Sequence, residues 1–367
     1  MLIAKLRYQG LFIAGLFVLL MLGSFVPDPF SHPVETRSAS TNVFKPIQDY
    51  VRFRMKYAAF APLVRGIVGY NLNSSLTSRV YISRNHHLYF AEDNATAQSF
   101  GDIYRQPEVA RFADIAAVLK RELRKEGSDL IVAIAPNAQS IAIEDMPFRP
   151  SEDVPREYDL ALHELKKRAI GTSDIRSVFL AHGDGKALYG STETHWNYLG
   201  ALLAFNSVVT DAGYPQWALP TSVLGPPSPV LGGDLSRFLG IQYYVRDMAP
   251  SVAIPIDGSW EKVSIMRSPP FLKVFDSHTY DRKGASERVG AEGARVLVLG
   301  DSFTQGFWLP FWKNTAAIDR IGWLHHAQCN FDFNDVRLFK PTLVIWVPTE
   351  RYVPCSLEQW PIGLPKE

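Results

Sequence analysis

Two short stretches of this chain carry the side chains that could do chemistry. The first is RVLVLGDSF at 295–303, in which Ser302 follows an apolar run and a glycine. A run of β-branched and leucyl residues is typical of a strand buried on both faces, and in open α/β sheets ligands bind beyond the carboxyl ends of such strands. Ser302 is therefore a candidate nucleophile. Asp301 is expected to accept backbone N–H bonds and to cap the element that follows.

A serine hydroxyl is a poor nucleophile unless a base lies beside it and a third group orients that base. The second stretch, YGSTETHW at 189–196, offers both. If this segment is extended, Glu193 and His195 lie two residues apart on the same side of the chain. We therefore expect His195 to act as the base and Glu193 to orient it, with Asp184 as the competing acid. The alternative for the first stretch is an ordinary turn at the end of a strand, and the alternative for the second is a histidine with a purely structural role.

Together the two stretches resemble the alginate O-acetyltransferase family of SGNH-hydrolase-like proteins. That family has an Asp-Thr-His-Trp motif followed, far downstream, by Gly-Asp-Ser-Phe; here the motifs read ETHW at 193–196 and GDSF at 300–303. Ordinary SGNH esterases have the serine block first, so the permuted order is itself diagnostic. Other stretches similar to the family stand at 80–90, 135–137, 233–235 and 350–352, and the resemblance spans residues 75–355.

The chain departs from the family pattern at two positions. Glu193 stands where the family usually has Asp, and Ala138 stands where it often has Lys. Glu is a known alternative to Asp as the third member of hydrolase triads, so we interpret the first change as altered geometry. The alternative is a scaffold that has lost activity.

The resemblance implies an SGNH-hydrolase-like three-layer α/β/α fold with a mostly parallel sheet. It implies an extracytoplasmic O-acetyltransferase that acetylates hydroxyls of an exported bacterial exopolysaccharide, alginate-like or cellulose-like, through an acetyl-serine intermediate. A polytopic membrane-bound O-acyltransferase, within an export and acetylation complex, would deliver the acetyl group, and no cofactor or metal is expected. A polysaccharide acetyl esterase with the same triad and a non-catalytic scaffold subunit are the alternatives.

Two more residues are candidates for the site because each follows a predicted buried strand. Asn137 comes after the predicted strand 130–134, where a carboxamide can donate to a developing oxyanion, as an Asn does in SGNH enzymes. Arg351 follows the predicted strand 341–347 and is expected to bind an anionic group, or else to pair with Glu350. Trp260 and Tyr280 are candidate sugar-stacking aromatics.

The N-terminus predicts the compartment. An uncharged and mainly apolar segment runs from Tyr8 to Pro27, which is long enough to span a bilayer as a helix. Lys5 and Arg7 precede it and place the short N-terminal side in the cytoplasm. No clear cleavage site follows, which favours an uncleaved signal anchor over a removed signal peptide. We therefore expect one span in the inner membrane and a body in the periplasm.

The expected organisation is an anchor at 1–27, a tether and leading helix at 28–74, and a catalytic domain at 75–367 with an irregular insertion at 213–293. Within that domain the periodicity predicts helices at 107–126, 155–169 and 198–212, and a further strand at 177–180. The net charge of +1 gives no sign of nucleic-acid binding. The two cysteines, Cys329 and Cys355, are either a disulfide in an oxidising compartment or two separate buried thiols.

Overall fold

The computed structural model describes residues 61–75, 77–146, 154–254, 258–263, 278–283, 293–315, 317–325 and 328–366, together with residue 15. The predicted anchor at 1–27 and most of the tether fall outside these ranges. Among the helices that are described, none combines the length and the apolar character needed to cross a bilayer. The predicted location in the membrane and periplasm therefore stays a prediction.

The body of the chain is built on one sheet of seven described strands, in the order β4-β3-β11-β9-β10-β8-β7. Strands β4, β3, β11, β9 and β10 run parallel, and β8 and β7 extend the sheet antiparallel. The sheet is thus mixed and mostly parallel, as predicted. In sheet order the strands are β4 Gly171–Ser173, β3 Asp129–Ala133, β11 Leu343–Val347, β9 Ala294–Gly300, β10 Ile318–His325, β8 His278–Arg282 and β7 Trp260–Val263.

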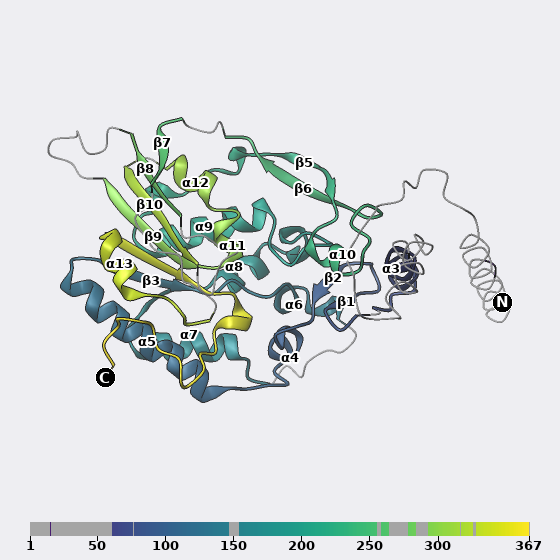
Figure 1. Ribbon diagram of the computed structural model, residues 1–367, viewed down its shortest axis with the longest axis horizontal. Coiled ribbons are helices and arrows are strands. Elements are labelled where there is room, and N and C mark those ends of the chain that lie inside the picture. Colours follow the sequence, from purple (N-terminus) through teal and green to yellow (C-terminus); the bar gives the residue numbers. More distant parts are fainter. Residues whose placement is uncertain are drawn as a thin grey trace, which may run out of the picture.

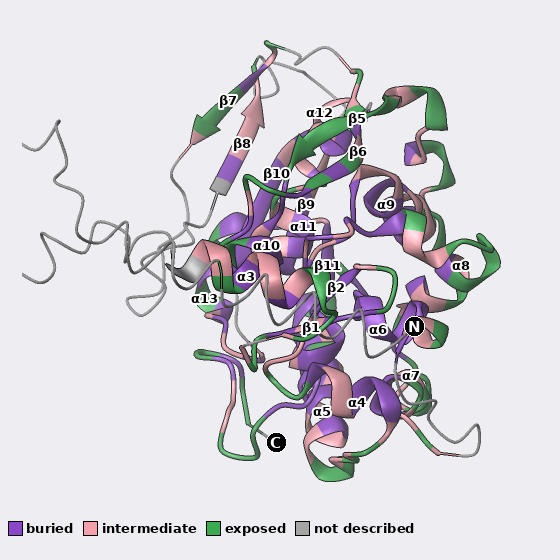
Figure 2. Ribbon diagram, turned by 90° about the vertical axis from the view of Figure 1, so that its right-hand side faces the viewer, coloured by how far each residue is buried: buried purple, intermediate pink, exposed green. Residues whose placement is uncertain are grey.

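Alternate residues of the central strands enter two separate cores, because successive side chains of a strand point to opposite faces. In β9, Val296 and Val298 belong to one core, and Leu297 and Leu299 belong to the other. Helices cover both faces, so the sheet is the middle of three layers (Figure 1), and its central strands are mostly buried whereas the edge strand β7 is mostly exposed (Figure 2). The first core takes helices α8 Ile175–Ala181, α9 Tyr198–Asp211 and α12 Leu309–Lys313, and the second takes α5 Gln106–Lys125, α7 Glu157–Lys167 and α13 Phe333–Phe339.

The three helices predicted from periodicity are confirmed as α5, α7 and α9. The strand predicted at 177–180 is wrong, since these residues lie in α8. The reason is local capping: the Asp174 side chain accepts the backbone N–H of Ser177 at 3.1 Å, which starts a helix and overrides the β-branched and aromatic composition. The strand of this unit is β4, which comes just before Asp174.

The proline-rich part of the predicted irregular insertion is in fact a strand. β5 (Leu224–Leu231) pairs antiparallel with β6 (Arg246–Val252) as a two-stranded ribbon. Proline is tolerated there because a ribbon strand has an open edge on which a missing N–H breaks no ladder bond. Residues 242–244, just before β6, form a turn.

A third, smaller core lies beside the main sheet. It joins the hairpin of β1 (Val80–Ile82) and β2 (Leu88–Phe90) to helix α10 (Asp234–Phe238) and to helix α3 (Ala61–Asn71). Figure 1 shows these elements together at one end of the molecule, next to the ribbon of β5 and β6. This end of the molecule supplies several of the contacts that hold the site described below.

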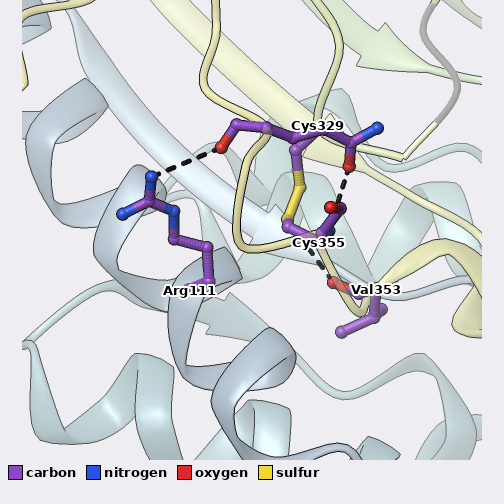
Figure 3. The surroundings of a disulfide bond; sticks show 6 residues. Arg111, Cys329, Val353 and Cys355 are labelled. Atoms are coloured by element: carbon purple, nitrogen blue, oxygen red, sulfur yellow. Dashed lines mark hydrogen bonds between the residues drawn. A yellow bond between two sulfur atoms is a disulfide. The ribbon is translucent and has the colours of Figure 1, made fainter.

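Cys329 and Cys355 form a disulfide, which confirms the first of the two alternatives for these residues. Both are fully buried, and Figure 3 shows the bond beside Arg111 of α5. The bond closes a loop with a sequence separation of 26 residues, so its removal should lower the free energy of unfolding by about 3 kcal/mol through the entropy of the unfolded chain. Urea unfolding of the C329S/C355S variant measures this, and an unchanged midpoint would show that the bond is not a restraint on the unfolded chain.

Candidate active site

Ser302 lies at the carboxyl end of β9, where the chain turns sharply into the short helix α11 (Ser302–Gln305). The turn requires glycine at position 300, because an added Cβ would come within 2.4 Å of the Thr304 hydroxyl. Asp301 caps α11 as predicted: its Oδ1 accepts the N–H of Phe303 at 3.0 Å, and its Oδ2 accepts the N–H of Thr349 at 3.0 Å. The second bond ties the end of β9 to the end of the neighbouring strand β11.

The acid–base pair lies on residues 189–197, which we call the acid–base loop. Tyr189 and Trp196 form an isolated antiparallel bridge, and the chain between them turns. The predicted extended segment is therefore wrong, although Glu193 and His195 still face each other. Asn197 ends the loop and caps α9 by accepting the N–H of Leu199 at 2.9 Å, so the histidine is fixed just before a long buried helix.

The structure brings the three predicted catalytic residues together. Ser302 Oγ lies 2.8 Å from Nε2 of His195, and Nδ1 of the same ring lies 2.6 Å from Oε1 of Glu193. A carboxylate is an acceptor, so Nδ1 carries the hydrogen and Nε2 is left to accept from the serine hydroxyl. The side chains of His195 and Glu193 are 20% and 26% exposed, so a substrate can reach the site. This arrangement can remove a proton from Ser302.

Trp196 and Phe303, the residues that follow His195 and Ser302, hold the two motifs against each other. The indole Nε1–H of Trp196 donates to the carbonyl of Phe303 at 2.9 Å, and the two rings meet edge to face with centroids 5.1 Å apart. Both side chains are fully buried. The imidazole of His195 also lies on the Phe303 ring, at 4.9 Å between centroids. The separation of the base and the hydroxyl is therefore set by packing in the core.

A second carboxyl group lies behind Glu193. The backbone N–H of Asp234, at the start of α10, donates to Glu193 Oε2 at 3.1 Å, and Asp234 Oδ1 accepts the N–H of Thr194 at 2.8 Å. Burial by itself would raise the pKa of Glu193, but hydrogen bonds from His195 and Asp234 outweigh it and lower this pKa to about 2. Burial and the adjacent Glu193 raise the pKa of Asp234 to about 6. Glu193 therefore stays ionised at neutral pH.

The acid–base loop is also clamped from β6. Oδ1 of Asp247 accepts the N–H of Ser191 at 2.7 Å, and its Oδ2 accepts the N–H of Thr192 at 3.0 Å. Sequence reasoning did not find Asp247, and it used residues 233–235 only as part of the family resemblance. No local pattern marks an aspartate that acts on a loop more than 40 residues away, so tertiary structure alone identifies this contact.

Asn137 does not lie where the sequence suggested. It is buried, its carboxamide nitrogen donates to Ser99 at 3.2 Å in helix α4 (Ala95–Phe100), and its backbone N–H donates to Glu350 at 2.8 Å. Among the residues that the structure describes, these bonds join α4 to the end of β11 and none reaches the triad. The predicted oxyanion role of this side chain is thus corrected: its donor is already used within the core.

Arg351 does lie beside the site. Its guanidinium is 5.6 Å from the centroid of the Phe303 ring and 4.9 Å from that of Phe90, the side chain is 9% exposed, and its Nε has no hydrogen-bond partner. The alternative pairing with Glu350 is wrong, because that carboxylate accepts hydrogen bonds from Ser140 and from the backbone of Asn137. Within the described parts of the chain no carboxylate pairs with this buried cation, which suits the binding of an anionic group.

The remaining candidates have other roles. Asp184 is exposed and caps the short helix at Gly185–Leu188, so it is not the acid for His195. Trp260 is buried, donates to the carbonyl of Lys313 at 3.1 Å and is covered by Arg282, which excludes it from stacking on a sugar. The ammonium of Lys313 lies 4.4 Å from the ring centroid of Tyr280 and covers one of its faces.

In the described ranges, one group of side chains has the composition of a metal site, namely Glu193, His195 and Asp234, with ligand atoms within 4.8 Å of one another. Their hydrogen bonds to one another account for this closeness. Because Nδ1 donates to Glu193, the ring has no lone pair there for a cation. The sequence-based expectation that no metal or cofactor takes part is left as a prediction, which activity in the presence of a chelator would test.

A cavity of about 670 Å³ opens next to the acid–base loop. One wall is the loop itself, including Ser191 and Asn197, and the facing wall is the proline-rich ribbon of β5 and β6. The charged residues of the lining are Lys186, Arg246 and Asp247, and Lys186 pairs with Asp145 at 2.7 Å.

Comparison with known proteins finds a family model that matches part of the chain. Residues 80–223 match the SGNH hydrolase-like domain of the acetyltransferase AlgX, a range that holds Glu193 and His195. The match confirms the resemblance found in the sequence and, with it, the class of SGNH-like O-acyltransferases. No curated protein matches the chain significantly.

Two solved structures with TM-scores above 0.5 resemble the chain in fold. A DHHW family protein from Eubacterium siraeum has 12% identity and a TM-score of 0.54, with 77% of this chain and 94% of that chain covered. Bacillus cereus PatB1 with a sulfonyl adduct has 10% identity and a TM-score of 0.53, with 76% and 95% covered. The O-acetyltransferase domain of Pseudomonas putida AlgJ has 15% identity and a TM-score of 0.49, with 77% and 95% covered.

Proposed function

We propose that this chain, whose residues 80–223 match the acetyltransferase domain of AlgX, transfers acetyl groups to hydroxyls of an exported bacterial exopolysaccharide. The observation that carries the proposal is the continuous hydrogen-bonded chain from Glu193 through His195 to Ser302. It has the order of acid, base and nucleophile that acyl transfer through a serine requires.

In the first half of the reaction, His195 Nε2 takes the hydroxyl proton while Ser302 Oγ attacks the acetyl carbonyl of the donor. The tetrahedral intermediate collapses, the donor's leaving group receives the proton from the imidazolium, and Ser302 carries an acetyl ester. In the second half, a sugar hydroxyl gives its proton to His195 and attacks this ester. Ser302 regains its proton, and the acceptor leaves as the acetylated sugar. Glu193 stabilises the imidazolium in both halves.

Two groups would stabilise the tetrahedral oxyanion and the substrate. The N–H of Ser302 is the first of α11, and such groups have no partner within their own helix. A donor at this position can point at the developing negative charge. Arg351, held over the Phe303 ring, would bind an anionic group of the donor or the acceptor. Arg351 thus takes the place of Asn137 as the second group that would stabilise negative charge at the site.

The cavity beside the acid–base loop would receive a segment of the acceptor. A uronate polymer such as alginate would pair with Arg246 of the lining, and a neutral glucan such as cellulose would use the proline-rich wall. The buried disulfide supports an oxidising compartment, in agreement with a periplasmic body held by the N-terminal segment. A polytopic membrane O-acyltransferase in an export complex would be the acetyl source.

The test is mass spectrometry on the full chain, purified in detergent and incubated with para-nitrophenyl acetate and short uronate or glucan oligomers, beside a Ser302→Ala control. Oligomers acetylated only by the chain that has Ser302 would establish the transferase and name the acceptor class. Release of acetate without transfer would favour an esterase, which the partial exposure of His195 to water makes a specific alternative. Equal labelling by the control would remove Ser302 from the chemistry and leave the scaffold.

A further inference from the structure

Asp247 of β6 is a buried carboxylate, 5% exposed, that no step of the proposed reaction uses. Its Oδ1 accepts the backbone N–H of Ser191 at 2.7 Å and also the hydroxyl of that residue. Its Oδ2 accepts the backbone N–H of Thr192 at 3.0 Å and the Thr192 hydroxyl at 2.5 Å. In the described part of the chain, the hydrogen bonds to this carboxylate therefore come from two successive residues of the acid–base loop.

The burial of Asp247 makes these bonds strong restraints on the loop. A carboxylate removed from water is stable only where hydrogen bonds replace its hydration, and bonds to a charged acceptor are roughly twice as strong as those between neutral groups. All four groups that face Asp247 are donors, so both of its oxygens act as acceptors. The loop satisfies this carboxylate only while the backbone of residues 191–192 is turned toward β6.

The same contacts reach Glu193, which directly follows Thr192. The Thr192 hydroxyl, besides donating to Asp247, accepts the backbone N–H of Gly233 at 2.7 Å, so the loop is held from two sides at this residue. An added Cβ at Gly190 would lie 3.2 Å from Asp247 Oδ2 and 2.8 Å from Glu193 Cβ. No side chain therefore fits where the two acids approach residue 190, and a shift of the loop at Asp247 would move Glu193 as well.

We propose that Asp247 is a positioning residue for the triad: by holding the two residues before Glu193, it keeps that carboxylate where it receives the Nδ1–H of His195. This inference rests on the proposed function, since it gives Asp247 a task in the same reaction. The hydrogen bonds of Asp247 do not reach Ser302 or the imidazole, so it acts through Glu193. Asp247 and Ser191 both line the cavity, and they connect its ribbon wall to the loop that carries the base.

Two variants weaken the contact to different extents. Asp247→Asn leaves one oxygen and turns an NH₂ group toward the donors of the loop. A hydroxyl can rotate and accept from that group, but a backbone N–H cannot, so at least one N–H of residues 191–192 loses its acceptor. Thr192→Val keeps the shape of the side chain and removes only the hydroxyl. If Asp247→Asn does not fold, Thr192→Val takes its place in the comparisons below.

Glu157→Gln is the matched control for loss of a buried carboxylate. Glu157 of α7 is fully buried and accepts hydrogen bonds from the side chains of Gln98 at 2.8 Å and Arg105 at 2.7 Å. It belongs neither to the acid–base loop nor to the site. Its replacement should lower stability as a buried acid does, without moving the triad.

For each full-length chain in detergent, the rate of Ser302 acetylation by para-nitrophenyl acetate and the midpoint of thermal unfolding are measured. Asp247→Asn should be about tenfold to 100-fold slower than wild type, as expected when a catalytic group is poorly placed. Thr192→Val should be about threefold to tenfold slower, because one bond of the four is lost. Glu157→Gln should stay within about twofold of the wild-type rate even where its unfolding midpoint falls.

A double variant separates positioning from structural support. In the Glu193→Gln background there is no carboxylate left to position, so adding Asp247→Asn should change the rate by no more than about threefold. A purely structural role predicts instead that the double variant shows the full loss of both replacements.

A further loss of about tenfold in the double variant would overturn the positioning role. So would a wild-type rate in both Asp247→Asn and Thr192→Val, or a loss in Glu157→Gln as large as that in Asp247→Asn. These outcomes differ from failure of the proposed function, which would be seen as labelling by para-nitrophenyl acetate that does not require Ser302 in the wild-type background.

Discussion

Replacing His195 with alanine should slow the acetylation of Ser302 by about 10,000-fold or more, because the hydroxyl loses its base while the rest of the site is unchanged. In the structure Nε2 of His195 is 2.8 Å from Ser302 Oγ, and the centroid of its ring is 4.9 Å from that of Phe303 and 6.1 Å from that of Phe307. The measurement is the rate at which the intact chain gains an acetyl group from para-nitrophenyl acetate. Added imidazole should restore part of the rate by occupying the space that the side chain leaves.

The control for this prediction is Asp184→Asn, which should keep the wild-type rate because Asp184 does not contact the triad. The unfolding midpoint should also change little in His195→Ala, since the buried partner in the core is Trp196. A rate loss below about tenfold would contradict the assignment of His195 as the base.

The second large effect is expected for Glu193→Gln, at about 1,000-fold to 10,000-fold in the same rate. The Asp234 N–H donates to Oε2 of Glu193, so a glutamine would place its oxygen there and turn its NH₂ group toward His195 Nδ1. A donor facing Nδ1 selects the tautomer that has its hydrogen on Nε2. That tautomer cannot accept the proton of Ser302, even though every heavy atom is in place.

Glu193→Asp is the matched comparison, because aspartate keeps the charge and is the residue usual in the family. It should retain activity within about tenfold of the wild-type rate, since a carboxylate one bond shorter still prefers an Nδ1–H donor. Equal losses in the Gln and Asp variants would show that the reach of the side chain matters and that the tautomer does not. An unchanged rate in Glu193→Gln would remove Glu193 from the triad.

Short-range signals identified the elements that place the nucleophile. The apolar run before Ser302 predicts a strand buried on both faces, and β9 is such a strand because its alternate residues enter two cores. Asp301 predicts a cap, and it caps α11. The same kind of signal gave a wrong prediction at 177–180. The composition there is typical of a strand, but a capping aspartate starts a helix. The signal failed again at 224–231, where prolines fit a two-stranded ribbon that has an open edge.

The sequence by itself determined which residue types could form the site: a serine after a strand, and a histidine two residues from a carboxylate. It also carried the resemblance to the alginate O-acetyltransferase family, because the order and the residues of the two motifs are properties of the chain. Only the tertiary structure decided that Glu193, and not Asp184, is the acid that contacts His195, that Asn137 is used within the core, and that Arg351 lies beside Phe303. Such contacts join residues that are far apart in the chain. They depend on how the third core docks beside the sheet, and no local periodicity records that geometry.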